Sequence, residues 1–253
     1  MCGMQGILVL CTILAFLGVW PVFPEVRVSR FGLYTNIIPS RSRTRKCYNY
    51  LMRKQVVVIH GYMGHPQSNW FPWLKAELEK QNIEVVVPHM PDPAWPTMET
   101  WVQTVQNIVG TLDNQTILVG HSLGGTTLLR YLEIIEKPQR AAGTVLVASP
   151  ILPPKALHLR GVKRSFFATA FDFTKIRQAA GEVCAIYSED DPIVSIASGH
   201  ILRDSLVDTY VEIPDGGHLN RKSGYTTFPL VLEKIMQVYQ SRQTTSPSTD
   251  APL

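Results

Sequence analysis

The sequence predicts an α/β protein built on a doubly wound, mostly parallel sheet with helices on both faces. Along most of the chain, short runs of β-branched residues alternate with amphipathic stretches of helical spacing. The first run, Gln55–His60, is almost continuously apolar, which is typical of a parallel strand covered on both faces. The run Ile117–Val119 leads directly into Gly-His-Ser-Leu-Gly, the pattern of a strand that turns sharply into a helix. This alternation indicates parallel strands joined by right-handed crossovers.

The remaining elements follow from the same two patterns. Further strands are expected, in chain order, at Ile83–Val87, Thr144–Ala148, Val183–Tyr187 and Thr209–Ile213. Helices are expected at 70–80, from an N-cap at Thr97 to about Ile108, from the Gly-rich turn to about Lys137, and at 228–239. Pro138 is expected to stop the third helix, because a proline ring clashes with the preceding turn.

The chain divides into one domain and two flanking segments. It has 253 residues, of which 45% are hydrophobic and 17% charged, enough to bury a sizeable core in one domain. We assign residues 1–54 to a hydrophobic and then basic N-terminal leader or extension, and residues 55–240 to the folded domain. Residues 241–253 are dominated by Ser, Thr, Pro and Gln, a composition that predicts a disordered tail.

The leader leaves the localisation open. Met1–Pro24 carries no charged residue, and Ile7–Phe23 is almost wholly apolar. As a helix this run would reach about 26 Å, slightly short of the ~30 Å hydrocarbon core of a bilayer. Three interpretations remain: a membrane anchor followed by cytoplasmic arginines, a cleaved secretory peptide, and an organelle leader or an extension ahead of an alternative start at Met52. Residues 7–23 are thus a candidate for membrane association, with a cytoplasmic or organellar location as the alternative.

Charge and composition exclude several classes of partner. The net charge is +4, but residues 1–54 hold eight Lys and Arg residues against a single acid, which leaves the remainder mildly acidic. A nucleic-acid-binding domain would carry a basic patch on its folded part, so we expect no nucleic-acid partner. The four cysteines lack metal-binding spacing, and no phosphate-cradling loop or dinucleotide fingerprint is present, so we expect no metal and no cofactor. The oligomeric state stays open.

Ser122 has the sequence context of a nucleophile elbow. It lies between Gly120 and Gly124, where larger side chains would collide in so sharp a turn. Its hydroxyl would then project at the carboxyl edge of the sheet, next to the amino end of a helix that begins at Leu123. Gly-x-Ser-x-Gly also occurs by chance, and it is the strand before it and the helix after it that favour the elbow.

Ser122 needs a general base, and His218 is the candidate. It follows the strand Thr209–Ile213 after two glycines, in a loop able to reach the edge that carries the serine. His60 and His121 also lie beside the site, but each fits a structural role in its own turn.

The base in turn needs a carboxylate to orient it. The strand Val183–Tyr187 leads into Asp190 and Asp191, at the same expected edge of the sheet. We choose Asp191 because its spacing to Val194 matches the position that such acids usually hold. Asp190 is the alternative acid, and its structural role would be to cap the turn or the following helix.

Two backbone N–H groups are candidates for binding a developing oxyanion. One belongs to Leu123 and the other to Tyr62, in the turn His-Gly-Tyr-Met-Gly after the first strand. Losing one such donor typically raises the activation barrier by about 3 kcal/mol. The plainer interpretation is a glycine turn that simply ends the strand. A further candidate region is Pro153–Phe173, a small lid whose four phenylalanines would line an acyl site.

In its ordered motifs the chain resembles the α/β-hydrolases, and within them the retinoblastoma-binding protein nine family. The superfamily motifs span about residues 55–240 and are His60-Gly61-x-x-Gly64, Gly120-His121-Ser122-Leu123-Gly124, Asp191 and His218. The subfamily motifs are Trp73-Leu74-Lys75-x-Glu77-Leu78-Glu79, Met90-Pro91-Asp92-Pro93 and Phe171-Asp172-Phe173-x-Lys175-Ile176. The resemblance implies a minimal cap and esterase- or amidase-like chemistry on a small-molecule acyl substrate. The chain departs from it in the hydrophobic leader and in the His60-Gly61 pair of the turn after the first strand, and the Leu-x-Cys-x-Glu pattern of retinoblastoma binding is absent.

Together these features predict a serine hydrolase that cleaves an ester, thioester or activated amide through an acyl-enzyme. Ser122 would be the nucleophile, His218 the base and then the acid, and Asp191 the orienting carboxylate. The alternative is a binding or scaffold protein that retains a hydrolase fold without turnover.

Overall fold

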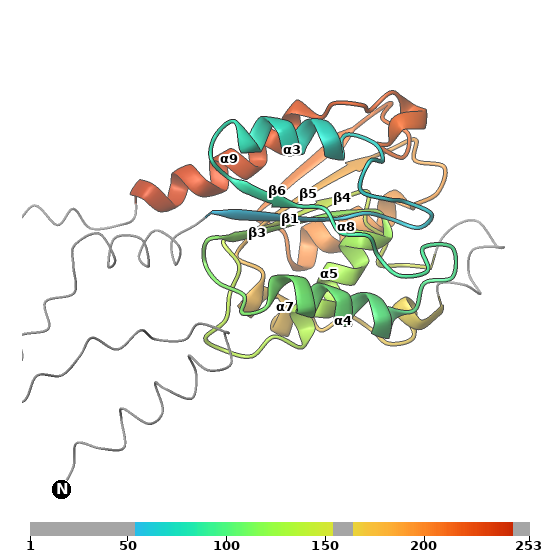
Figure 1. Cartoon of the computed structure of the whole chain (residues 1–253). Coiled ribbons are helices and arrows are strands. Elements are labelled where there is room, and N and C mark those ends of the chain that lie inside the picture. Colours follow the sequence, from blue (N-terminus) through green and yellow to red (C-terminus); the bar gives the residue numbers. More distant parts are fainter. Residues whose placement is uncertain (1–53, 154–163, 245–253) are drawn as a thin grey trace, which may run out of the picture. The chain divides into compact units, whose positions relative to one another are not determined.

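The computed structural model describes residues 54–153 and 164–244, and these contain a six-stranded sheet (Figure 1). The strands are β1 (Gln55–Ile59), β2 (Glu84–Val86), β3 (Thr116–His121), β4 (Gly143–Val147), β5 (Glu182–Ser188) and β6 (Thr209–Ile213). They pair in the order β2-β1-β3-β4-β5-β6, and every pair is parallel. The predicted α/β class with a parallel sheet is therefore confirmed.

Helices cover both faces of the sheet. They are α3 (Phe71–Glu79), α4 (Met98–Val109), α5 (Leu123–Glu133), α7 (Phe173–Ala179), α8 (Ile196–Ser205) and α9 (Pro229–Thr244), with 3₁₀ turns η1 (Arg164–Phe167) and η2 (Arg221–Ser223). The helices α3 and α9 share one hydrophobic cluster with the sheet, whereas α4, α5, α7 and α8 share the other. In Figure 1, α3 and α9 accordingly lie on the opposite side of the strands from α4, α5 and α7.

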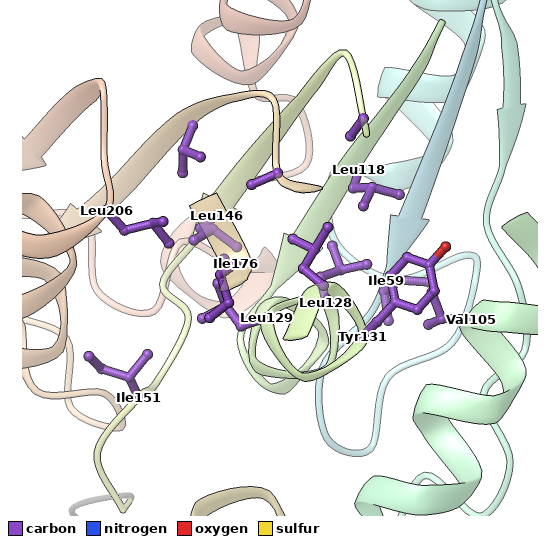
Figure 2. Packing of buried hydrophobic residues seen from close by; sticks show 14 of the residues in the cluster. Ile59, Val105, Leu118, Leu128, Leu129, Tyr131, Leu146, Ile151, Ile176 and Leu206 are labelled. Carbon is purple, nitrogen blue, oxygen red and sulfur yellow. The ribbon is translucent and has the colours of Figure 1, made fainter. Parts of the chain in front are cut away.

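The alternation of strand side chains supplies both halves of the core. Val56 and Val58 point to the side of α3 and α9, while Val57 and Ile59 point to the side of α5, because successive side chains of a strand face opposite ways. Figure 2 shows the second cluster, in which strand residues such as Leu118 pack against α5. The helix α5 is buried from Leu123 to Leu132, so its position is set by the strands beneath it and the helices beside it.

The order of the strands creates a crevice at one edge of the sheet. β1 and β3 are neighbours, yet β1 continues into α3 on one face and β3 continues into α5 on the other. At such a switch point the two connections leave in opposite directions and open a space outside the carboxyl ends of the strands. This edge carries the candidate site.

The ends of two predicted helices differ from the structure. The helix α5 ends at Glu133 rather than near Lys137, because a residue before proline disfavours helical angles and the chain must leave the helix earlier. The helix α9 runs to Thr244, so residues 241–244, which we expected in the disordered tail, are helical. No glycine or proline occurs between Tyr239 and Thr244 to stop it, and Arg242 donates a hydrogen bond to the carbonyl of Asn114. The rest of the leader and tail lie outside the described residues.

A buried arginine ties the chain before α7 to the helix that follows the serine. The Arg130 guanidinium donates to the carbonyls of Phe166, Thr169 and Ala170 and forms an ion pair with Glu133 at 2.9 Å. It also lies 3.7 Å from the centre of the Phe171 ring. With Arg130 only 4% exposed, these contacts satisfy nearly all of its donors and fix residues 166–171 against α5.

We therefore expect Arg130→Met to lower the free energy of unfolding by about 3 kcal/mol, because it removes the hydrogen bonds of three carbonyls and the ion pair of the partly buried Glu133 carboxylate. The matched control is Arg177→Met, since Arg177 pairs with Asp208 at the surface and exposed pairs contribute about 1 kcal/mol or less. Urea unfolding of both variants measures the difference. Equal losses in the two would contradict the assigned role of Arg130.

Candidate active site

Ser122 lies in the turn between β3 and α5 with a backbone conformation that only a constrained residue keeps. Its φ is 54° and its ψ is −128°. The flanking glycines are required by contact: a Cβ on Gly120 would lie 2.3 Å from the Cα of Gly125, and one on Gly124 would lie 2.1 Å from the carbonyl oxygen of Ile59. The sharp turn expected from the sequence is present, and it aims the Ser122 side chain at the carboxyl edge of the sheet.

The structure brings Ser122, His218 and Asp191 into one hydrogen-bonded chain. The His218 Nε2 lies 3.0 Å from the Ser122 Oγ, and its Nδ1 lies 2.8 Å from the Asp191 Oδ2. A carboxylate can only accept, so Nδ1 carries the proton and Nε2 is left to accept from the serine hydroxyl. The other oxygen of Asp191 accepts from the N–H groups of Ile193 and Val194 at 2.8 and 2.9 Å, which fixes the buried carboxylate.

Asp190 holds the loop of His218 rather than its imidazole. Its carboxylate is exposed and accepts from the Ser188 hydroxyl at 2.6 Å and from the Gly217 N–H at 2.7 Å. The hydrogen bond from Ser188, and then that from Gly217, lowers the pKa of the Asp190 carboxyl. Of the two adjacent acids that the sequence offered, Asp191 is therefore the one that contacts the imidazole of His218.

Sequence reasoning missed two further serines that fix the loop of His218. The Ser223 hydroxyl accepts from the His218 N–H at 3.1 Å, and the Ser188 hydroxyl accepts from the Gly216 N–H at 2.8 Å. Ser223 lies in a polar turn without periodicity, so no local signal could have singled it out. Ser188 closes a buried strand, and a polar residue at that point was the available signal.

The turn after β1 lies directly against the serine. A Cβ on Gly61 would lie 2.8 Å from the Cβ of Ser122, so glycine is needed for this approach. The turn is held by the Met63 N–H, which donates to the Pro93 carbonyl, and by the Gly64 N–H, which donates to the Gly61 carbonyl. Tyr62 follows Gly61 in this turn.

Leu123 is the first residue of α5. Its N–H is therefore one of the opening amides of the helix, which lack an acceptor within the helix and lie at its positive end.

His60 and His121 are neutral groups with structural contacts. The His60 Nδ1–H donates to the Gly61 carbonyl, and its Nε2 accepts from the Met90 N–H, which joins the turn after β1 to the loop before α4. The His121 Nε2–H donates to the carbonyl of His218 at 3.0 Å. Burial lowers the pKa of both imidazoles, for His121 to about 3.

The low pKa of His121 predicts an acid-sensitive fold. The unfolded chain binds a proton at this residue near pH 6.5 and the folded chain only near pH 3. The contribution of neutral His121 to the free energy of unfolding is therefore complete above pH 6.5. As the pH falls through this window, stability should decrease by up to about 1.4 kcal/mol per unit. Unfolding free energies at pH 4–7 should therefore fall more steeply for wild type than for His121→Gln. If the unfolding free energies of the two proteins fell in parallel with pH, His121 would not be the source of the acid sensitivity.

A pocket of about 430 Å³ opens in front of Ser122 and His218. Its lining includes Tyr62 and Met63, Ile193 and residues 220–222. The phenylalanines of the expected lid do not line it within the described residues: Phe166 is buried in the core against Trp101, with ring centres 5.9 Å apart, and Phe171 stacks on Phe173. Residues 154–163 of that segment lie outside the described part of the chain.

The possibility of a membrane anchor rests on residues that the structure does not describe. Within 54–153 and 164–244, none of the helices has both the length and the apolar character needed to cross a bilayer. The candidate run 7–23 precedes these ranges, so its role stays a prediction.

Comparison with known proteins identifies the family. The family model described as serine hydrolase matches residues 56–237, well over half of the chain. This protein belongs to the serine hydrolase family. Within it, the Bacillus subtilis (strain 168) protein YdeN, named as a candidate hydrolase, is 33% identical over 193 residues, covering 76% of this chain and all of YdeN. Serine hydrolase RBBP9 of Rattus norvegicus is 23% identical, covering 65% of this chain and 86% of its own length.

Solved structures show the same fold. The crystal structure of the ydeN gene product from B. subtilis aligns with a TM-score of 0.70 at 32% identity, covering 74% of this chain and 99% of that one. Est1E from Butyrivibrio proteoclasticus, solved with ferulic acid, has a TM-score of 0.58 at 12% identity, covering 76% and 90% of the two chains. The expected resemblance to the α/β-hydrolases and to the retinoblastoma-binding protein nine family is thus confirmed, and this member is a hydrolase of that fold.

Proposed function

We propose that this serine hydrolase cleaves an ester, thioester or activated amide of a small-molecule acyl substrate through an acyl-enzyme. The observation that carries the proposal is the hydrogen-bonded chain from Ser122 through His218 to Asp191, which opens onto a pocket. All three residues are buried, with at most 6% of each exposed, so their contacts form away from bulk water, where they are stronger.

In the first half of the reaction, the Ser122 Oγ attacks the carbonyl carbon while the His218 Nε2 takes the serine proton. Asp191 stabilises the imidazolium that results and keeps Nδ1 protonated, which leaves Nε2 as the base. His218 then donates its proton to the leaving group, and the acyl group stays on Ser122. In the second half, a water molecule attacks the acyl carbon while the His218 Nε2 takes a proton from it. His218 then returns this proton to the Ser122 Oγ, and the carboxylic acid is released.

The oxyanion formed in each half needs donors that are already in place. We assign this role to the N–H groups of Tyr62, which follows Gly61 in the turn packed against Ser122, and of Leu123, the first residue of α5. Two backbone donors of this kind bind the developing charge more strongly than the ground-state carbonyl, which lowers the barrier.

The direct test is covalent labelling with a fluorophosphonate probe, which reacts with an activated serine. Wild type should be labelled and Ser122→Ala should not, because the nucleophile is gone. Ser68→Ala, which removes another serine of the same pocket, is the matched control and should still be labelled. A folded wild type that stays unlabelled would instead favour the non-catalytic binding or scaffold role.

The two adjacent acids offer a second test. Asp191→Asn should reduce kcat by about 10⁴-fold, because an amide no longer holds the tautomer that leaves Nε2 as the base. Asp190→Asn keeps an oxygen that accepts from the Gly217 N–H, so we expect it to reduce kcat by less than about 10-fold. Hydrolysis of a p-nitrophenyl ester measures both, and similar losses in the two variants would refute Asp191 as the orienting acid.

A further inference from the structure

The pocket in front of Ser122 is lined on one side by two adjacent cationic residues, Arg221 and Lys222. Both side chains are exposed and stand in the same cavity as His218. None of the described residues that line this cavity is an aspartate or a glutamate. The residues that line the cavity thus supply two cations and no carboxylate, while Asp191 lies behind the His218 imidazole and Asp190 accepts from Gly217 outside the lining.

The backbone that carries these cations is fixed to the site. η2 begins three residues after His218, and the Asn220 side chain caps it by accepting from the Ser223 N–H at 3.1 Å. The Arg221 N–H donates to the Asn69 side chain, which belongs to the loop before α3. Because Ser223 also accepts from the His218 N–H, the cations and the candidate base belong to one hydrogen-bonded unit.

The two cations lack the carboxylate partners that other arginines of the domain have. Arg130, Arg177 and Arg203 each form an ion pair with a glutamate or aspartate. Among the described residues, no acid lies within ion-pair distance of Arg221 or Lys222. Their charges are thus available to a bound molecule.

We propose that Arg221 and Lys222 form an anion-binding subsite that makes the enzyme selective for acyl substrates bearing a carboxylate or phosphate group. This inference rests on the proposed function, because the subsite acts on substrates of Ser122. Arginine binds planar oxyanions through paired N–H donors, and lysine adds a point charge. A positive pocket also raises the local concentration of anionic substrates, and added salt weakens this attraction.

The test uses three p-nitrophenyl esters with the same leaving group and the same chain of four methylenes. They are the hydrogen adipate, with a free carboxylate, the methyl adipate, which is neutral, and the 5-phosphonopentanoate. We expect kcat/KM to be at least about 10-fold higher for an anionic ester than for the neutral one, mostly through KM, since each partly exposed contact contributes a few-fold. The carboxylate and phosphonate arms show which anion is preferred.

The double variant Arg221→Gln/Lys222→Gln should bring this ratio close to 1. The control Lys80→Gln/Arg203→Gln removes the same charge from exposed positions outside the cavity and should keep the ratio. A wild type that labels with fluorophosphonate but shows no preference, or a double variant that keeps it, overturns the subsite alone. A wild type that neither labels nor hydrolyses the neutral ester overturns the proposed function and the subsite with it.

Discussion

The close approach between the end of β1 and the first turn of α5 is the constraint on which the rest of the site depends. Gly124 lies so near the Ile59 carbonyl that no side chain fits between them. The approach persists because α5 is buried on all sides and Arg130 fixes its outer surface to the following chain. Ser122 is held in its strained conformation as a result, since the backbone on either side cannot relax.

The position of His218 depends on contacts from elements far apart in the sequence. Its carbonyl accepts from His121, its N–H donates to Ser223, and its imidazole binds Asp191. The next residue, Leu219, accepts from the buried Trp70 indole. The loop is thus held by the carboxylates of Asp190 and Asp191 together with neutral groups, while η2 supplies its cations to the lining of the pocket. One loop therefore joins the candidate base to the surface that we propose selects the substrate.

Most of the fold could be predicted because its signals are local. The inner strands β1, β3, β4 and β5 are buried on both faces and read as apolar runs, and the Thr97 cap appears where the sequence placed it. A helix was expected after Asp191, and α8 is that helix, but its bounds were not predicted. The helix α7 was not predicted, since it is short and its buried face is small. Its cap, Asp172, was the available signal, but such residues are equally common in turns.

The sequence by itself determined the candidate nucleophile and the strand ends that carry its partners, because a sharp turn demands glycines at fixed spacing and parallel strands share one edge. Only the tertiary structure shows that Asp191, and not Asp190, contacts the imidazole of His218, since neighbouring residues in a turn point in different directions and spacing does not say which way. It alone also placed Arg221 and Lys222 in the pocket. That placement arises from hydrogen bonds between η2, the loop before α3 and His218, which no local pattern records.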